Sequence, residues 1–187
     1  MLLGGPAAGL VFGVGVTWLG LARPGYSAVR QTVSELGPLG GPGRISLAAL
    51  NLVVALCSLI FACGLAAVAR PLLPALFMAL YAVLVIGLAA FPSQHRVHNV
   101  FGLLQTIPFI GAPLAVALGW RGDGAAAALS WVALVLLILG MALNLAPAFS
   151  PRLAKALAPV YGLVQRSLFI AWYAWCAALG LLLLMGS

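Results

Sequence analysis

The chain has 187 residues, of which 65% are hydrophobic and 6% are charged, with nine Lys and Arg against two Asp and Glu and a net charge of +7. A soluble domain would carry about a quarter charged residues, so this composition excludes a water-soluble globular protein. The basic residues stand singly between apolar runs, which is typical of membrane proteins and argues against nucleic-acid binding.

Six apolar runs approach or exceed the ~20 residues that cross the hydrocarbon core of a bilayer. They predict an all-α polytopic membrane protein, a compact bundle of six transmembrane helices that forms one domain over residues 1–187. The first run is interpreted as a retained helix, because its start lacks the positive charge of a signal peptide. The runs are Leu2–Ala22, Ile45–Val68, Leu72–Phe91, Val100–Gly119, Ala125–Leu145 and Tyr161–Met185.

Lys and Arg are distributed unequally between the loops. Seven lie in the first, third and fifth loops or at their margins, and only Arg70 and Arg121 lie in the even ones. Positively charged loops stay in the cytoplasm, so we expect a multi-pass protein of the cell membrane, here the bacterial inner membrane, with both termini outside. The seven are Arg23, Arg30, Arg44, Arg96, Arg152, Lys155 and Arg166.

The first polar segment, residues 23–37, contains Glu35, one of only two carboxylates. The other, Asp123, lies in an expected solvated turn. Ser27 is a plausible N-cap and Gly37 followed by Pro38 is a stop signal, so a short amphipathic helix is expected between the first and second spans. Glu35 then points either into water or into the mouth of the bundle.

The second polar segment leads into the fourth span and holds both histidines, His95 and His98. His98 shares a helical face with Gln105. Two histidines three residues apart, with no third histidine and no cysteine nearby, do not make a metal or haem site, so no metal and no cofactor are predicted. A histidine at a helix start that is satisfied by backbone or water is the alternative to a functional role.

The third polar segment is Gln165-Arg166, at the start of the sixth run. Arg166 either marks the interface or lies about two turns inside the helix, where it would cost about 2.5–3.5 kcal/mol and need a partner. Glu35 is the only carboxylate expected on that side of the membrane. By elimination, Glu35 is expected to pair with Arg166 or Arg30.

All three polar segments fall in odd loops and hence on one membrane face, which favours a site there. Glu35 and His98 are the catalytic candidates, because both side chains can transfer protons. An arginine fork suits a phosphate or carboxylate head group. The candidates for ligand binding are Tyr26, Arg30, Gln105 and Arg166.

These segments also resemble a known family. Four motifs carry the resemblance: Pro24-Gly25-Tyr26-Ser27 after the first span, then Thr32-Val33-Ser34-Glu35-Leu36-Gly37, Phe91-Pro92 with His98, and Gln165-Arg166. Together they are similar to domain-of-unknown-function family 998 of bacterial and archaeal membrane proteins. Where the pattern leads us to expect an acidic residue after Phe-Pro, this chain has Ser93-Gln94. The resemblance implies six spans and a membrane location, and no established activity.

Three functions stay open. The first is a membrane-embedded site near the cytoplasmic face that binds or processes a lipid-like amphiphile, with catalysis itself undecided. The second is a structural or accessory subunit of a membrane complex, either as a homo-oligomer or with a partner membrane protein. The third is a small proton-coupled carrier, since ionisable residues inside membranes often mark such pathways. Membrane lipid surrounds the chain in each case.

Overall fold

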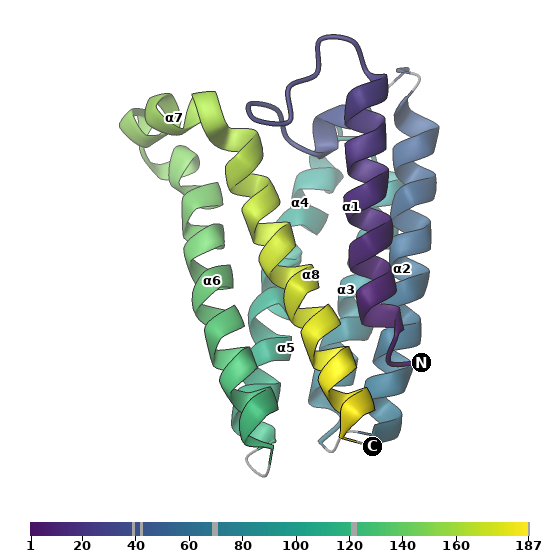
Figure 1. Ribbon diagram of the computed structural model, residues 1–187. Coiled ribbons are helices and arrows are strands. Elements are labelled where there is room, and N and C mark those ends of the chain that lie inside the picture. Colours follow the sequence, from purple (N-terminus) through teal and green to yellow (C-terminus); the bar gives the residue numbers. More distant parts are fainter. Residues whose placement is uncertain (39, 42, 69–70, 121–122, 187) are drawn as a thin grey trace.

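The computed structural model describes residues 1–38, 40–41, 43–68, 71–120 and 123–186. Among them the secondary structure is helical, without strands, and six helical segments are long and apolar enough to cross a membrane. The predicted bundle of six transmembrane helices is confirmed (Figure 1). The α-helices are α1 (Gly4–Ala22), α2 (Gly43–Val68), α3 (Leu73–Ala90), α4 (Arg96–Leu104), α5 (Thr106–Gly119), α6 (Gly124–Phe149), α7 (Pro151–Leu157) and α8 (Tyr161–Met185), with short 3-10 helices η1 (Ser34–Leu36) and η2 (Ala158–Val160).

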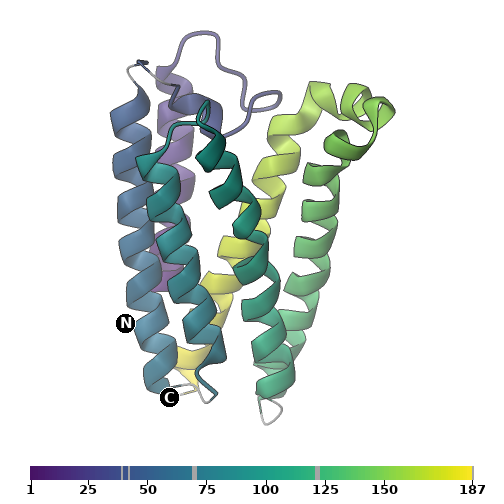
Figure 2. The same cartoon turned by 180° about the vertical axis from the view of Figure 1, so that it is seen from behind.

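The three polar segments lie at one end of the bundle, here called the loop end. The connection from α1 to α2, the junction of α3 with α4, and α7 all lie there, while both chain termini lie toward the opposite end (Figures 1 and 2). This arrangement agrees with the expectation that the polar segments share a face. Arg70 and Arg121, which entered the comparison of loop charges, lie outside the described residues.

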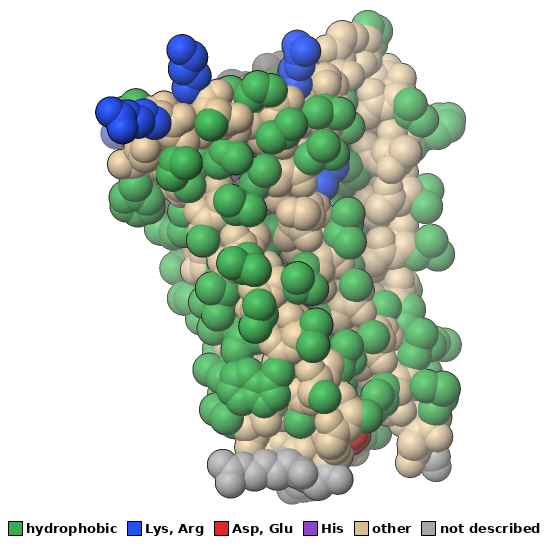
Figure 3. Space-filling view, turned by 60° about the vertical axis from the view of Figure 1, so that its left-hand side comes forward, with side chains coloured by type: hydrophobic (Ala, Val, Ile, Leu, Met, Phe, Trp, Pro, Cys, Tyr) green, Lys and Arg blue, Asp and Glu red, His purple; other side chains and the backbone are tan. Residues whose placement is uncertain are grey.

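The outer surface of the bundle is apolar. Large hydrophobic side chains such as Trp18, Leu21 and Ile45 are exposed, and hydrophobic side chains cover the flank in Figure 3, where Lys and Arg gather near the loop end. Exposed apolar surface on this scale is unstable in water and fits a lipid surrounding.

Aromatic side chains fill the middle of the bundle. Trp172 of α8 packs against Tyr81 of α3 and Phe109 of α5, with each pair of ring centroids 4.9 Å apart. The hydroxyl groups of Tyr81 and Tyr173 form a buried hydrogen bond of 2.7 Å. The aromatic residues of α8 therefore serve packing, and they hold α3, α5 and α8 in fixed positions below the loop end.

The fourth span is one apolar run in the sequence but two helices in the structure. α4 ends at Leu104 and α5 begins at Thr106, with Gln105 buried between them. Pro108 has no N–H for the carbonyl of Leu104, and its ring clashes with that carbonyl, so the helix breaks here. Below the break α5 packs against α6, whereas α4 and α6 separate toward the loop end (Figure 2).

The amphipathic helix expected between the first two spans is not confirmed. The segment instead makes a turn in which the N–H groups of Arg30 and Gln31 both donate to the carbonyl of Ser27, followed by the three-residue η1. The carbonyls of Ala28 and Gln31 accept from the Arg166 side chain on α8, and the Thr32 N–H donates to the Glu35 side chain, which competes with an α-helical ladder. The helix α7 was not predicted; Ser150 caps it, and its first residue is Pro151.

Candidate functional site

The segment between α1 and α2 is held against the first turns of α8. The Leu163 N–H donates to the carbonyl of Val29 at 3.1 Å, and the Val33 N–H donates to Oε1 of Gln165 at 2.7 Å. Gly162 permits this contact, because a Cβ there would lie 2.4 Å from the Gln31 carbonyl oxygen. The N–H of Leu163, in the first turn of α8, which has no partner inside the helix, thereby meets a carbonyl of the segment.

Arg166 completes the attachment. Its Nη1 donates to the carbonyls of Ala28 at 2.7 Å and Gln31 at 2.8 Å, and its Nη2 donates to the hydroxyl of Tyr26. The guanidinium also lies over the Tyr26 ring, 5.6 Å from the centroid. We call Gly162, Gln165 and Arg166 the α8 clamp. Arg166 is half-buried in the second turn of α8, and the dipoles of the carbonyl groups that it contacts balance its charge.

Glu35 acts inside the same segment. Its Oε1 accepts hydrogen bonds from the N–H and the hydroxyl of Thr32, each at 2.9 Å, and its Oε2 accepts one from Nε2 of Gln31 at 3.3 Å. The described residues show no ion pair of Glu35 with Arg166 or Arg30, so the expected pairing is wrong. Donors three and four residues away already occupy the carboxylate, while nearby carbonyls occupy the Arg166 fork.

Ser34, next to Glu35, faces the other way. Its hydroxyl lies 2.9 Å from Nε2 of His98, and Nδ1 of His98 lies 2.9 Å from the carbonyl oxygen of Phe91. A carbonyl only accepts, so Nδ1 carries the hydrogen. The hydrogen bond of Ser34 with His98 joins η1 to α4, and His98 is 9% exposed.

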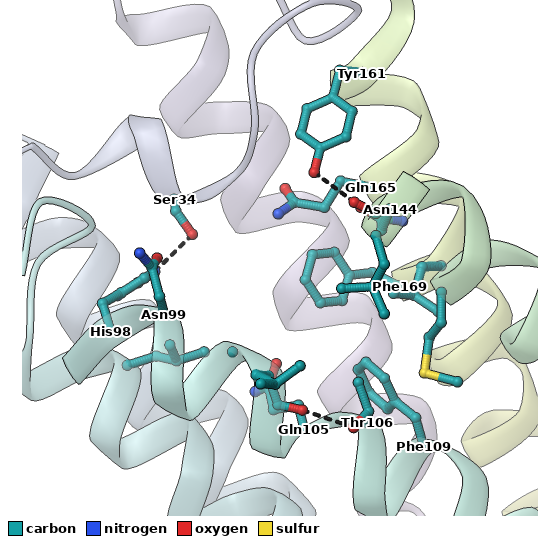
Figure 4. Close-up of a pocket in the computed structure, with 16 residues that line it drawn as sticks. Ser34, His98, Asn99, Gln105, Thr106, Phe109, Asn144, Tyr161, Gln165 and Phe169 are labelled. Atoms are coloured by element: carbon teal, nitrogen blue, oxygen red, sulfur yellow. Dashed lines mark hydrogen bonds between the residues drawn. The ribbon is translucent and has the colours of Figure 1, made fainter. Parts of the chain in front are cut away.

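A cavity of about 300 Å³ lies directly beyond this pair, between α4, α5, α6 and α8 (Figure 4). We call it the interhelical cavity. Polar side chains line it on the side of the loop end, and deeper in the bundle apolar side chains line it together with Gln105 and Thr106 (Figure 4). The polar side chains toward the loop end include Ser34, His98, Asn99, Asn144, Tyr161 and Gln165, and the apolar side chains include Phe109, Met141, Leu168 and Phe169.

Among the comparisons with known proteins, a family model matches most of the chain. Residues 6–182 match the model of the family described as protein of unknown function (DUF998). The chain belongs to this family. The matched region runs from α1 to α8 and includes the α8 clamp and every residue that lines the interhelical cavity. No curated protein and no solved structure matches the chain.

The residues predicted for a site fall into two adjacent groups. Tyr26, Glu35 and Arg166 belong to the network that fixes the segment on α8, whereas His98 and Gln105 line the interhelical cavity. Arg30 is exposed on the turn of the segment. The two groups meet at consecutive residues, because Ser34 faces the cavity and its neighbour Glu35 caps the turn.

Sequence reasoning did not select Ser34, Gly162 or Asn99. Ser34 stands within the Ser-Glu-Leu-Gly motif, but the scarcity of carboxylates drew attention to Glu35 alone. Asn144 of α6 joins two helices, because its Nδ2 donates to the carbonyl of Val164 on α8 at 3.2 Å. Among the described residues, no group of three His, Cys, Asp or Glu side chains is placed to hold a metal ion.

A second hollow, of about 470 Å³, lies between α1 and α8 on the outer flank. Gly9, Gly13 and Thr17 line it from α1, and Arg166 borders it. Almost all of its lining is apolar, so an acyl chain of a surrounding lipid would fit here without a specific head-group contact. This apolar hollow is therefore a suitable control site for ligand binding in the interhelical cavity.

Proposed function

We propose that the protein binds a lipid-like amphiphile in the interhelical cavity. The observation that carries the proposal is the change of lining along the cavity. Hydrogen-bonding side chains such as Asn99 and Gln165 lie toward the loop end, and Phe109, Met141 and Leu168 lie deeper. A volume of about 300 Å³ is at the lower end of the range for small-molecule pockets.

The chemistry of the lining favours an uncharged head group. Its polar members are hydroxyl, amide and imidazole groups, with no Lys, Arg, Asp or Glu among the described residues that line it. An anionic phosphate would be left without a counter-charge there, at a high desolvation cost. An ester, amide or alcohol would find donors and acceptors at Asn99, Tyr161 and Gln165.

The cavity has a route to the bilayer. Leu103 of α4 and Leu145 of α6 both line it and are both exposed on the outer surface. Its mouth therefore opens on the flank between these two helices. A lipid-like molecule can enter sideways, with its polar part near the interface and its chain in the hydrocarbon region.

We place the loop end in the cytoplasm. The Lys and Arg residues of the described loops lie at this end, including Arg30 on the turn and Arg152 and Lys155 on α7. Such a bias marks the cytoplasmic face of a cell-membrane protein. Trypsin cleavage after Arg30 in oriented membrane vesicles measures the side directly; cleavage from the periplasmic side would overturn the assignment.

Gly102 offers a direct test of binding. It lines the interhelical cavity, and a Cβ there would meet nothing within 4 Å, so Gly102→Phe should fill the space without disturbing the fold. Gly13→Phe is the matched control, because its Cβ is equally free but faces the second hollow. The measurement is mass spectrometry of small molecules extracted from the purified proteins.

An uncharged amphiphile should accompany the wild type and Gly13→Phe and be absent from Gly102→Phe. The same lipids in all three samples would contradict specific binding in the interhelical cavity. Loss in Gly13→Phe alone would move the site to the hollow between α1 and α8.

A further inference from the structure

The geometry of Ser34 and His98 resembles that of an activated nucleophile. A serine hydroxyl attacks poorly until an adjacent base takes its proton, and the base must itself be oriented by a third group. The carbonyl of Phe91 holds the hydrogen on Nδ1 of His98, which leaves Nε2 of the neutral ring to accept from the Ser34 hydroxyl at 2.9 Å. In serine hydrolases a carboxylate fills the orienting position; here a backbone carbonyl does so.

We propose that Ser34 and His98 cleave a carboxylic ester in the amphiphile that occupies the interhelical cavity. This inference rests on the proposed binding function and adds a reaction to it. Ser34 is the nucleophile and His98 the general base and acid. Both side chains line the cavity, so the hydroxyl faces space where an ester carbonyl can sit rather than packed core.

The α8 clamp gives the nucleophile a fixed position. The N–H of Val33 is bonded to Gln165, the Gly37 N–H donates to the carbonyl of Ser34 at 3.3 Å, and Leu36 is 1% exposed. Ser34 is thus anchored on both sides by backbone contacts. A reacting group held in this way loses little entropy on reaching the transition state.

Amide donors are available for the charge that develops on the ester oxygen. Gln165 uses its Oε1 to accept from Val33, so its Nε2 hydrogens are left for the cavity. Asn99 and Gln165 line the cavity from opposite sides (Figure 4). Primary amides in such positions stabilise a tetrahedral oxyanion in known acyl-transfer enzymes.

The reaction balances without an oxidant or a metal. Oγ of Ser34 bonds to the acyl carbon while its proton moves to Nε2 of His98, and the C–O bond to the alcohol then breaks as the alcohol takes that proton. Water next attacks the acyl-serine, gives one proton to His98, and releases the acid; that proton returns to Oγ. The sum is ester plus water to carboxylic acid plus alcohol. The acyl chain would lie along Phe109 and Leu168.

A serine-reactive probe tests this step. A fluorophosphonate carrying a decyl chain should label the wild-type protein in detergent, and peptide mass spectrometry should place the adduct on Ser34. Ser34→Ala should abolish labelling, and His98→Gln should slow it about 100-fold, the order of magnitude that general bases contribute. Ser167→Ala is the control, since that exposed hydroxyl bonds to the Val164 carbonyl at 2.8 Å.

Absence of labelling in the wild type, labelling that survives Ser34→Ala, or a rate unchanged in His98→Gln would overturn the proposal. Hydrolysis of p-nitrophenyl decanoate by the same variants should follow the labelling. The extracted amphiphile separates this failure from a failure of binding. If the wild type retains the amphiphile but is not labelled, the binding proposal stands and the reaction is ruled out. If Gly102→Phe loses both the amphiphile and the labelling while Gly13→Phe keeps them, both proposals are supported.

Discussion

The two ends of the bundle hold their helices together by different physical means. Away from the loop end, α1 contacts α2 and α8 backbone to backbone. A Cβ at Gly4 would lie 2.5 Å from the Cys57 carbonyl oxygen, and one at Gly5 would lie 2.5 Å from that of Cys176. At the loop end, Arg166 donates hydrogen bonds to the segment between α1 and α2 and Gln165 accepts one from it, while α4 and α6 enclose a cavity beside it.

This difference separates stability from function. Backbones in van der Waals contact cannot adjust, so the end with the glycine contacts should set the unfolding free energy of the bundle. A segment held by side-chain hydrogen bonds can be released without separating the helices, because local opening costs less than global unfolding. The loop end can therefore carry a ligand cavity whose changes leave the rest of the bundle folded.

The largest effect is expected where glycine allows backbone contact. Gly5→Val should lower the free energy of unfolding by about 3 kcal/mol or more, because the added atoms must displace the backbone of α8. Gly13→Val, in the same helix, is the control, since its Cβ meets nothing within 4 Å. Circular dichroism of purified protein in mixed micelles with rising SDS measures both. Equal falls in the unfolding free energy of Gly5→Val and Gly13→Val would show that the helix propensity of valine, not close packing, causes the loss of stability.

At the loop end, Arg166→Met should release the segment and leave the bundle folded. The carbonyls of Ala28 and Gln31 would lose charged donors, which destabilises the attachment by about 2 kcal/mol. Trypsin should then cut after Arg30 faster, while the SDS midpoint changes less than for Gly5→Val. Arg166→Lys should not restore protection, because an ammonium lacks the planar fork.

The matched control for this variant is Arg152→Met, which removes an exposed cation from α7 at the same end. Its cleavage after Arg30 should equal that of the wild type. An unchanged cleavage rate in Arg166→Met would mean that the backbone bonds alone hold the segment and that the guanidinium of the α8 clamp does not fasten it.

The spans were predictable because hydropathy is a local property. The predicted run Tyr161–Met185 coincides with α8, and Leu72–Phe91 exceeds α3 (Leu73–Ala90) by one residue at each end. The break at Gln105 was not predicted, although Pro108 is visible in the sequence. A proline kinks or ends a helix according to which neighbours satisfy the freed carbonyl, and that depends on the surrounding fold.

The site was predictable only in part. Scarcity of charge drew attention to Glu35 and Arg166, but the pairing expected between them is wrong, because elimination assumed that a buried cation needs a carboxylate. Backbone carbonyls satisfy Arg166 instead, and no sequence pattern marks a carbonyl that its own segment leaves unpaired. Ser34 and His98 are 64 residues apart, beyond the reach of any helical spacing rule.

The smallest effect is expected for Glu35→Gln. This variant tests whether the Glu35 carboxylate caps the turn or carries a proton in the reaction. A glutamine Oε1 can still accept from the N–H and hydroxyl of Thr32, while its amide would face Nε2 of Gln31 and lose one bond. The free energy that holds the segment in place should fall by about 1 kcal/mol, which is too little to release the segment from α8. The fluorophosphonate labelling rate should therefore stay within about twofold of the wild type.

Glu35→Ala, which also leaves the Thr32 donors unpaired, should speed trypsin cleavage after Arg30. A Glu35→Gln protein that stays protected from trypsin yet loses labelling would instead place the carboxylate in the chemistry.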